Sequence, residues 1–364
     1  MQEKITLEDM GYNDFFESGR IKMGLDGFAV ARVIVEYRGS YKVKNADGEH
    51  LAKVTGKQML NASSREDYPA VGDWVVISAV NAEQAVIHGV LPRKTLIKRN
   101  HSDKSRKDAK NEIQIIGANV DVAFIVESID RDFNLNRFER YFVIANDGGV
   151  KPVVVLNKID LISKEDLDLK LIEIKNRFND IEIIQTSTLK DEGLEELKKH
   201  IEKGKTYCFL GSSGVGKSSL INKLLGRDAA KTLRVGLRSH RGKHTTTNRE
   251  MYFLETGGVV IDNPGMREVG MADVSGGVEE LFDEIRVLAE GCKFADCAHV
   301  HEPGCEVLAA LHAGTLDAAK YSNYINLKKE GEYYDMTELE KREKDRQFGK
   351  FVKTYKKQSK KYKN

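Results

Sequence analysis

Residues 205–226 read KTYCFLGSSGVGKSSLINKLLG, and this stretch decides the fold. The run 206–210 is apolar and suits a buried strand, residues 211–218 match G-x-x-x-x-G-K-[ST], and the residues after them carry a helical pattern. A strand, a glycine-rich loop and a helix in this order form the phosphate-binding loop of P-loop proteins. We therefore predict an α/β domain built around this unit, since a chance glycine-rich turn would lack the flanking strand and helix.

The loop predicts which groups would hold the phosphates of a nucleotide. Its glycines let backbone N–H groups face a β-phosphate at the positive end of a helix. Lys217 would place its ammonium between the β- and γ-phosphates, and Ser218 would ligate Mg²⁺. The residues expected to contact nucleotide here are Gly211, Ser212, Ser213, Gly214, Val215, Gly216, Lys217, Ser218 and Ser219.

A second anion-binding element is Asp262-Asn263-Pro264-Gly265, which follows the apolar run 258–261. A strand end at this place would let Asp262 hold Mg²⁺ through water and the Gly265 amide meet the γ-phosphate. Most D-x-P-G strings are plain turns. Together with the phosphate loop, this one predicts a nucleotide-sensing segment.

The string Asn157-Lys158-Ile159-Asp160 closes the apolar strand KPVVVL and predicts a base-reading loop. The carboxylate of Asp160 can accept hydrogen bonds from N1–H and the 2-amino group of guanine, whereas adenine has no 2-amino donor. Ser187 follows the next strand, and two interpretations stay open for it: it backs the guanine, or it caps a helix.

These motifs run in an unusual order, because the base reader precedes the phosphate loop, the switch and D-x-P-G. Such a circular permutation is physically permissible, since site geometry depends on strand positions at one edge of a parallel sheet. The segment after D-x-P-G runs directly into the C-terminal part of the chain and could swing it.

The switch between the two anion elements reads RGKHTTT over residues 241–247. We expect the hydroxyl of Thr246, with Thr245 as its nearest rival, to complete the Mg²⁺ shell. Met266 stands where many such proteins carry a water-orienting Gln. His244 is therefore the candidate to position the attacking water, and an exposed His without a catalytic role is the alternative.

Three cysteines crowd together near the C-terminus, whereas Cys208 stands alone in the strand before the phosphate loop. Crowding of this kind in a reducing compartment favours a metal over a disulfide. Three thiolates and one imidazole complete the tetrahedral set of a structural Zn²⁺ site. The ligands expected are Cys292, Cys297, His299 and Cys305, with His301 as the rival fourth ligand.

The 364 residues exceed what one core usually serves, so we expect several domains. Short β-rich runs between residues 29 and 93 suit a small OB-type barrel, although sandwiches and other small barrels give similar patterns. The predicted division is an N-terminal extension (1–28), an OB-fold domain (29–99), a polar linker, a permuted GTPase-type α/β domain (112–270), a helical zinc-binding domain (276–330) and a basic tail (331–364).

Charge and hydropathy narrow the class of protein further. No apolar run of about 18 residues exists, and the first twenty residues lack a secretory pattern, so we expect a cytoplasmic protein that spans no membrane. Residues 341–364 hold eleven Lys/Arg against two acids, a net charge of +9. The tail is either a solvated arm or a contact for an RNA backbone.

Over residues 29–324 the sequence resembles the RsgA/YjeQ family of circularly permuted GTPases, through NKIDL, GSSGVGKSSLIN, RGKHTTT, DNPG and the C-x4-C-x-H-x5-C string. The resemblance implies GTP/GDP, Mg²⁺ and one structural Zn²⁺ as ligands, and a monomer that binds the small (30S) ribosomal subunit and its rRNA. It also implies that GTP hydrolysis, stimulated by the subunit, is linked to late maturation and release.

Within that resemblance the family's catalytic histidine falls on His244 and its zinc ligands on the four residues named above. Asn263 departs from the family's usual Thr, from which we expect a tuned rate and an intact site. Two other functions compete with this one: a GTP-dependent binding module with little turnover, and a GTPase that delivers metal, which a closed Cys₃His set disfavours.

Overall fold

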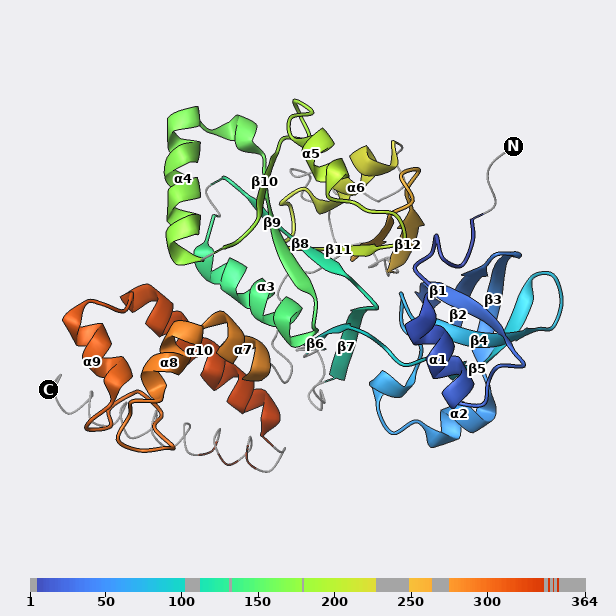
Figure 1. The fold of residues 1–364 in the computed structure, drawn as a ribbon, viewed down its shortest axis with the longest axis horizontal. Helices are drawn as coiled ribbons and strands as arrows, with labels where there is room; N and C mark the ends of the chain where they lie inside the picture. Colours follow the sequence, from blue (N-terminus) through green and yellow to red (C-terminus); the bar gives the residue numbers. More distant parts are fainter. Residues whose placement is uncertain are drawn as a thin grey trace, which may run out of the picture.

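The computed structural model describes residues 5–101, 112–130, 133–178, 180–226, 249–263 and 275–336, together with residues 340, 343 and 346. It shows a barrel, an α/β unit and a group of helices placed in a row (Figure 1). The switch residues 241–247, Gly265, Met266 and most of the basic tail lie outside the described residues. Among those described, no helix combines the length and apolarity that a membrane crossing needs.

The first unit is a closed five-stranded barrel. Its strands are β1 (Ala29–Tyr37), β2 (Ser40–Asn45), β3 (Gly48–Val54), β4 (Trp74–Ala79) and β5 (Gln84–Val90). They follow the order β1-β2-β3-β5-β4, and β4 pairs back to β1 from Ala29↔Ile77 to Arg32↔Trp74. Closure removes the free edges that a sandwich would keep. The predicted OB-type barrel is confirmed, and the sandwich alternative is wrong.

The segment before the barrel is folded against it. Helix α1 (Asp14–Lys22) begins at Asn13, whose side chain accepts a hydrogen bond from the amide of Phe15 at 3.1 Å. Met10 and Phe16 are buried and pack on Trp74 in a cluster with the outer barrel wall. Helix α2 (Gly56–Asn61) and a short 3₁₀ turn (Arg65–Asp67) connect β3 to β4.

The central unit is a six-stranded sheet in the order β10-β9-β8-β11-β13-β12. Its strands are β8 (Val122–Ser128), β9 (Lys151–Asn157), β10 (Ile183–Thr186), β11 (Thr206–Leu210), β12 (Glu250–Phe253) and β13 (Val259–Asp262). Pairing is parallel except between β12 and β13. The predicted parallel α/β domain is confirmed, with all parallel strands ending at one edge.

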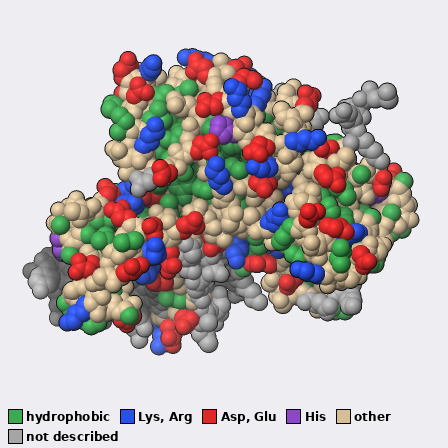
Figure 2. Space-filling view, in the orientation of Figure 1, with side chains coloured by type: hydrophobic (Ala, Val, Ile, Leu, Met, Phe, Trp, Pro, Cys, Tyr) green, Lys and Arg blue, Asp and Glu red, His purple; other side chains and the backbone are tan. Residues whose placement is uncertain are grey.

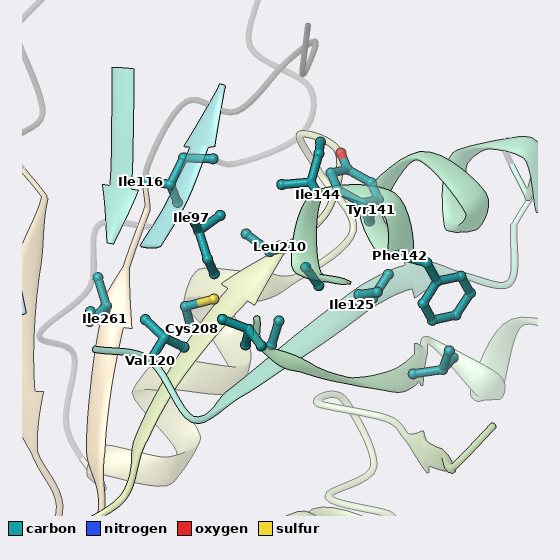
Figure 3. Close-up of a cluster of buried hydrophobic side chains, with 14 of the residues drawn as sticks. Ile97, Ile116, Val120, Ile125, Tyr141, Phe142, Ile144, Cys208, Leu210 and Ile261 are labelled. Carbon is teal, nitrogen blue, oxygen red and sulfur yellow. The ribbon is translucent and has the colours of Figure 1, made fainter. Parts of the chain in front are cut away.

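Helices cover both faces of this sheet and enclose two cores. They are α3 (Leu135–Asp147), α4 (Lys164–Arg177), α5 (Leu194–Lys199) and α6 (Lys217–Leu225), with a 3₁₀ turn at Ile159–Leu161. Figure 3 shows the core under α3, where Tyr141 and Phe142 meet Ile125, Leu210 and Cys208. Cys208, which stands apart from the other three cysteines, is thus a buried residue of β11 that packs as an apolar side chain.

Barrel and α/β sheet are joined edge to edge, which the sequence did not indicate. Val35 of β1 pairs antiparallel with Glu250 of β12, so one eleven-stranded sheet runs through both units. A hairpin of β6 (Leu96–His101) and β7 (Glu112–Ala118) lies between them, and its Ile97 and Ile116 enter the core under α3 (Figure 3).

The C-terminal unit consists of α7 (Ser275–Leu281), α8 (Asp283–Ala289), α9 (Glu306–Ala313) and α10 (Ala318–Asp335). Helices α7 and α8 are separated at Phe282, whose ring is buried in the helical core. Gly277 lies so close to α3 that a Cβ there would overlap the carbonyl oxygen of Val143.

A buried ionic group also fastens these helices to α3. Glu139 of α3 is 1% exposed, receives a hydrogen bond from Arg177 at 2.7 Å and is bonded by the side chain of Asn323 on α10. Arg140 and Glu330 add a bidentate pair with two 2.7 Å bonds. The helical unit is therefore held against the α/β unit by these polar side chains as well as by apolar contacts of Val143.

Candidate nucleotide site and Cys3His cluster

The phosphate loop lies where the sequence predicts it, between the carboxyl end of β11 and the start of α6. Gly211 and Gly216 have φ values of +145° and +104°, which side-chain-bearing residues rarely adopt. A Cβ on Gly216 would overlap the side-chain nitrogen of Asn157. These two glycines are therefore required by both the turn and the neighbouring loop.

Lys217 is folded back onto its own loop. Its ammonium donates hydrogen bonds to the carbonyl oxygens of Gly211 at 2.6 Å and Ser212 at 2.7 Å. Burial lowers its pKa to about 8, and the nearby carboxylates of Asp262 and Glu127 oppose that shift. No carboxylate within the described ranges forms an ion pair with Lys217, and a buried cation of this kind is well placed to gain an anionic ligand.

Asp262 ends β13 with its side chain 6% exposed. Successive strand residues point to opposite faces, so Asp262 shares the face of Val260, whose core includes Leu220 and Ile221 of α6. That places the carboxylate towards the helix that begins with Lys217 and Ser218. Burial raises its pKa to about 6, against the opposing charge of Lys217.

The next residue, Asn263, is 1% exposed, and both polar atoms of its side chain lack a partner among the described residues. It stands where the sequence departs from the expected Thr. Leaving a buried carboxamide without partners costs on the order of 1–3 kcal/mol, so a hydrogen-bond partner for this side chain would stabilise the site.

Asn157 ties the predicted base-reading loop to the phosphate loop. Its side-chain nitrogen donates to the carbonyl oxygen of Val215 at 2.8 Å, and its side-chain oxygen accepts from Thr186 at 3.1 Å. All three residues are buried. The end of β9, the end of β10 and the phosphate loop therefore meet at one edge, as the motif order requires.

Asp160 and Ser187 are also brought together. The hydroxyl of Ser187 donates to the carboxylate of Asp160 at 2.5 Å and accepts from the amide of Lys190 at 3.1 Å. Helix α5 begins later, with Gly193 at its N-cap, so the helix-capping interpretation of Ser187 is wrong. Ser187 instead orients the carboxylate that would read the base.

Lys158 adopts a left-handed conformation with φ of +64°, and its ammonium lies 3.1 Å from the carboxylate of Asp130. Asp130 follows β8 and lies outside any motif, so no sequence pattern singles it out. The ion pair fixes the side chain that would flank the nucleotide base.

Glu127, near the phosphate loop, is a second residue that the sequence motifs do not predict. Glu127 of β8 is fully buried and pairs with Arg137 of α3 at 2.9 Å, and burial raises its pKa to about 6. The only available signal was an acid inside the apolar run VAFIVES. Its second oxygen has no partner among the described side chains.

The predicted switch residues His244 and Thr246, together with Gly265, lie outside the described residues. Ser212, Ser213, Gly214, Ser218 and Ser219 occupy the loop and the first turn of α6 as expected. Within the described residues, the structure brings together the phosphate loop, the loop at Asn157–Asp160 with Ser187, and Asp262.

The cysteine cluster is closed and compact. The ligand atoms of Cys292, Cys297, His299 and Cys305 all lie within 4.8 Å of one another. The sulfur atoms of Cys292 and Cys305 are 3.8 Å apart, and the Nδ1 atom of His299 lies 3.6 and 3.5 Å from them. Zn–S bonds of about 2.3 Å in a tetrahedron give S–S edges of roughly 3.8 Å, so the residues fit zinc.

The surrounding loop holds this arrangement. His299 has a φ of +61°, and its carbonyl oxygen accepts a hydrogen bond from the hydroxyl of Tyr321 at 2.7 Å. The carboxylate of Glu302 accepts three backbone N–H groups, from Ala298, Val300 and His301. His301 itself is exposed and is not one of the four clustered ligands.

Comparison with known proteins gives consistent matches. A family model described as RsgA GTPase matches residues 90–272. "Small ribosomal subunit biogenesis GTPase RsgA 1" of Bacteroides thetaiotaomicron is 38% identical over 98% of this chain and 98% of its own. "Small ribosomal subunit biogenesis GTPase RsgA 2" of Listeria monocytogenes is 40% identical over 94% and 95% of the two chains.

Two solved structures share the fold. The crystal structure of YjeQ from Thermotoga maritima superposes with a TM-score of 0.59 at 29% identity and covers 82% of this chain and 96% of its own. YloQ, described as a circularly permuted GTPase, gives a TM-score of 0.57 at 22% identity and covers 85% and 97%. The second likeness supports the permuted fold alone.

Proposed function

The chain belongs to the RsgA family of GTPases, and we propose that it binds the small ribosomal subunit, hydrolyses GTP there and uses hydrolysis to time its release. The observation that carries this proposal is the meeting of Lys217, Asp262, Asn157 and the Ser187–Asp160 pair at one edge of the sheet. Both curated relatives described above are named for small ribosomal subunit biogenesis.

We assign guanine recognition to Asp160, held in orientation by Ser187. A carboxylate with two acceptor oxygens matches the adjacent N1–H and 2-amino donors of guanine and leaves one acceptor unpaired against adenine. Asn157 and Lys158 complete the base site, the first by tethering the phosphate loop and the second by flanking the ring.

The phosphates would occupy the loop from Gly211 to Ser219. Lys217 now donates to two carbonyl oxygens of the loop, and a phosphate would replace these neutral acceptors with charged ones, which bind an ammonium more strongly. Ser218 and Asp262 would hold Mg²⁺, joined by Thr246 of the switch. When bound, Mg²⁺ would neutralise charge on the β- and γ-phosphates.

We assign positioning of the attacking water to His244, from the sequence alone. Met266 cannot orient water, and His244 is the nearest polar residue of the switch. If His244→Ala binds GTP normally and hydrolyses it at the wild-type rate, this assignment is wrong.

The Cys₃His cluster would hold one structural Zn²⁺, since four protein ligands leave no open coordination position. The ion would fix the loop between α8 and α9 and thereby the helical unit docked on α3. A role in metal delivery is not favoured by a closed site.

The partner we propose is the small subunit and its rRNA, which would place the chain in the cytoplasm. An OB-type barrel is a frequent oligonucleotide binder. Charged side chains of both signs are interspersed over the described residues of the face in Figure 2, so that face carries no continuous basic surface. The tail at 341–364, with its net charge of +9, is the strongest basic segment of the sequence.

The test is GTP hydrolysis by the purified chain with and without purified small subunits. We expect the subunit to raise the turnover number at least tenfold and Lys217→Ala to abolish the stimulated rate. A GTP-dependent binding module with little turnover predicts no stimulation, and that result would replace the proposal. The relatives' names describe GTPases, which favours turnover.

A further inference from the structure

A cavity of about 440 Å³ lies where the N-terminal segment, the barrel and the α/β unit meet. Its walls come from all three: Gly11 and Tyr12 precede α1, Arg32 and Trp74 belong to the barrel, and Lys205 and Thr206 open β11. Volumes of roughly 300–1,000 Å³ are typical of small-molecule sites. The motifs assign no function to this cavity.

The cavity lies far from the phosphate loop. Thr206 and Lys205 stand at the amino end of β11, whereas the phosphate loop follows its carboxyl end at Leu210. Five strand residues span about 16 Å at 3.3 Å each. A ligand in the cavity would therefore bind at the opposite edge of the sheet from the nucleotide.

Arg32 makes the cavity unusual, because it is a fully buried cation bonded only to neutral groups. Its guanidinium donates to the carbonyl oxygens of Gly72 (3.2 Å), Asn119 (3.2 Å) and Met10, and to the hydroxyl of Thr206 (2.8 Å). None of the carboxylates in the described ranges forms an ion pair with it. Burial lowers its pKa to about 10, which the more distant Asp121 and Asp73 only partly oppose.

Buried charges in proteins are normally paired, since an isolated one loses its hydration without compensation. Four of the five guanidinium N–H donors are accounted for by the bonds above. One donor remains for a ligand, and the positive charge is offset only by Asp121 and Asp73, neither of which forms an ion pair with Arg32.

A second cation stands at the same cavity. Lys94 lies with its ammonium 5.3 Å from the ring centres of both Phe15 and Phe16, and no carboxylate of the described chain forms an ion pair with it. The other lysines of the wall differ, because Lys203 pairs with Asp9 and Lys205 with Glu202, each at 2.7 Å. Arg32 and Lys94 are therefore the two cations of this wall that form no ion pair within the described residues, and the carboxylates of Glu8 and Asp121 also line it.

The wall also offers an aromatic surface with a free donor. Trp74 is fully buried, and its indole N–H has no hydrogen-bond partner among the described residues. Tyr12 packs edge-on against it with ring centres 4.9 Å apart, and the Arg32 guanidinium lies 5.4 Å from the indole. An unpaired N–H beside aromatic rings suits a planar ligand that carries an acceptor.

We propose that this cavity binds a small phosphate-bearing molecule with a planar ring, of the size of a nucleoside monophosphate. The phosphate compensates Arg32 and Lys94, and the ring packs against Trp74 and accepts its indole hydrogen. Because residues of three units line the site, the bound ligand stabilises the barrel in its present position on the α/β unit.

Trp74 is the only tryptophan of the chain, so tryptophan fluorescence reports on the surroundings of this one residue of the cavity wall. The experiment is a titration of the full chain with 5′-AMP, which lacks the 2-amino group that Asp160 would require. We expect a saturable change in emission and, by equilibrium dialysis, one molecule of AMP per chain. An emission that does not change, or that changes without saturating, overturns the proposal.

Variants locate the binding. Lys94→Ala should weaken AMP binding about tenfold, whereas Lys53→Ala, which removes an exposed lysine of β3 outside the cavity, should leave it unchanged. Thermal unfolding of both variants checks that they fold. Equal affinity in Lys94→Ala and the wild type contradicts the proposed site.

Two further arms separate the alternatives. Lys217→Ala should leave the AMP titration unchanged, and loss of binding in that variant would place AMP in the phosphate loop and overturn the proposal. Inorganic phosphate should bind at least tenfold more weakly than AMP, and equal affinity would contradict the contribution of the ring. Neither result depends on GTP hydrolysis, so the proposed function is tested separately.

Discussion

The side-chain nitrogen of Asn157 lies 2.8 Å from the carbonyl oxygen of Val215, which joins two loops that are 58 residues apart in the chain. In an unpermuted GTPase the phosphate loop precedes the base-reading loop along the chain, whereas here it follows that loop. The hydrogen bond forms all the same, because both loops leave the same edge of the sheet, at strands separated only by β8. The permutation therefore changes which segments follow one another along the chain, but it keeps the contacts between the loops of the site.

Asn157→Ala should weaken GDP and GTP binding equally, by about one order of magnitude. The change leaves the buried carbonyl of Val215 and the hydroxyl of Thr186 without their partner, a loss of about 1–3 kcal/mol. Isothermal titration calorimetry with both nucleotides measures the effect. A loss confined to GTP would show that the bond senses the γ-phosphate, contrary to our assignment.

Asp160→Asn should exchange guanine for xanthine. Xanthine carries an oxygen where guanine has its 2-amino group, and a carboxamide can donate to that oxygen, whereas the carboxylate can only accept. We expect GTP affinity to fall about a hundredfold and XTP affinity to rise, measured by competition with a fluorescent nucleotide. Ser187→Ala, which removes only the orienting hydroxyl, should weaken GTP without this exchange.

The pH dependence of kcat/KM should be bell-shaped. Nucleotide binding needs an ionised Asp262, whose pKa burial raises to about 6, and a protonated Lys217, whose pKa burial lowers to about 8. The rate should therefore rise with pH through about 6 and fall through about 8. GDP binding without Mg²⁺ should keep only the upper limb.

Glu127 also has a pKa raised to about 6 by burial, so Glu127→Gln is the control for the acid limb. If the acid limb persists in Glu127→Gln, it belongs to Asp262; if it disappears, it belongs to Glu127.

The stability of the folded protein should also depend on pH through Lys217. Between the folded pKa of Lys217 near 8 and its higher unfolded value, the unfolded chain binds more protons, so the nucleotide-free protein should gain stability as pH rises.

Removing one thiolate should release the metal and loosen the helical unit. Cys305→Ser should lower the zinc content from one ion per chain to a small fraction and reduce the helicity contributed by α7 to α10. His301→Ala is the matched control, because His301 is exposed and outside the cluster. Elemental analysis after dialysis measures the zinc content of both variants, and His301→Ala should keep its zinc. Full zinc retention by Cys305→Ser would contradict the ligand assignment.

Much of the site could be predicted because its residues follow local rules. The phosphate loop needs glycines at fixed spacing, and a metal cluster needs thiolates and an imidazole at short separation, so both leave a signature in consecutive residues. The barrel strands, too, show in the alternation of residues 29 to 93.

What escaped prediction depends on contacts between distant segments. The pairing of Val35 with Glu250 joins two sheets through a single register point and has no local pattern. In the sequence, Arg32 and Glu127 look like solvent-exposed charges on two strands. They are buried only because other segments of the folded chain pack over them. The break between α7 and α8 at Phe282 likewise follows from burial of its ring in the helical core. A helical periodicity of 3.6 residues does not indicate such a break.

The most direct test of the central claim is the affinity of the full chain for purified small ribosomal subunits in two nucleotide states. Our account predicts binding at least tenfold tighter with a non-hydrolysable GTP analogue than with GDP, measured by co-sedimentation at one salt concentration. Equal affinities in the two states would contradict it, because hydrolysis could then not time release.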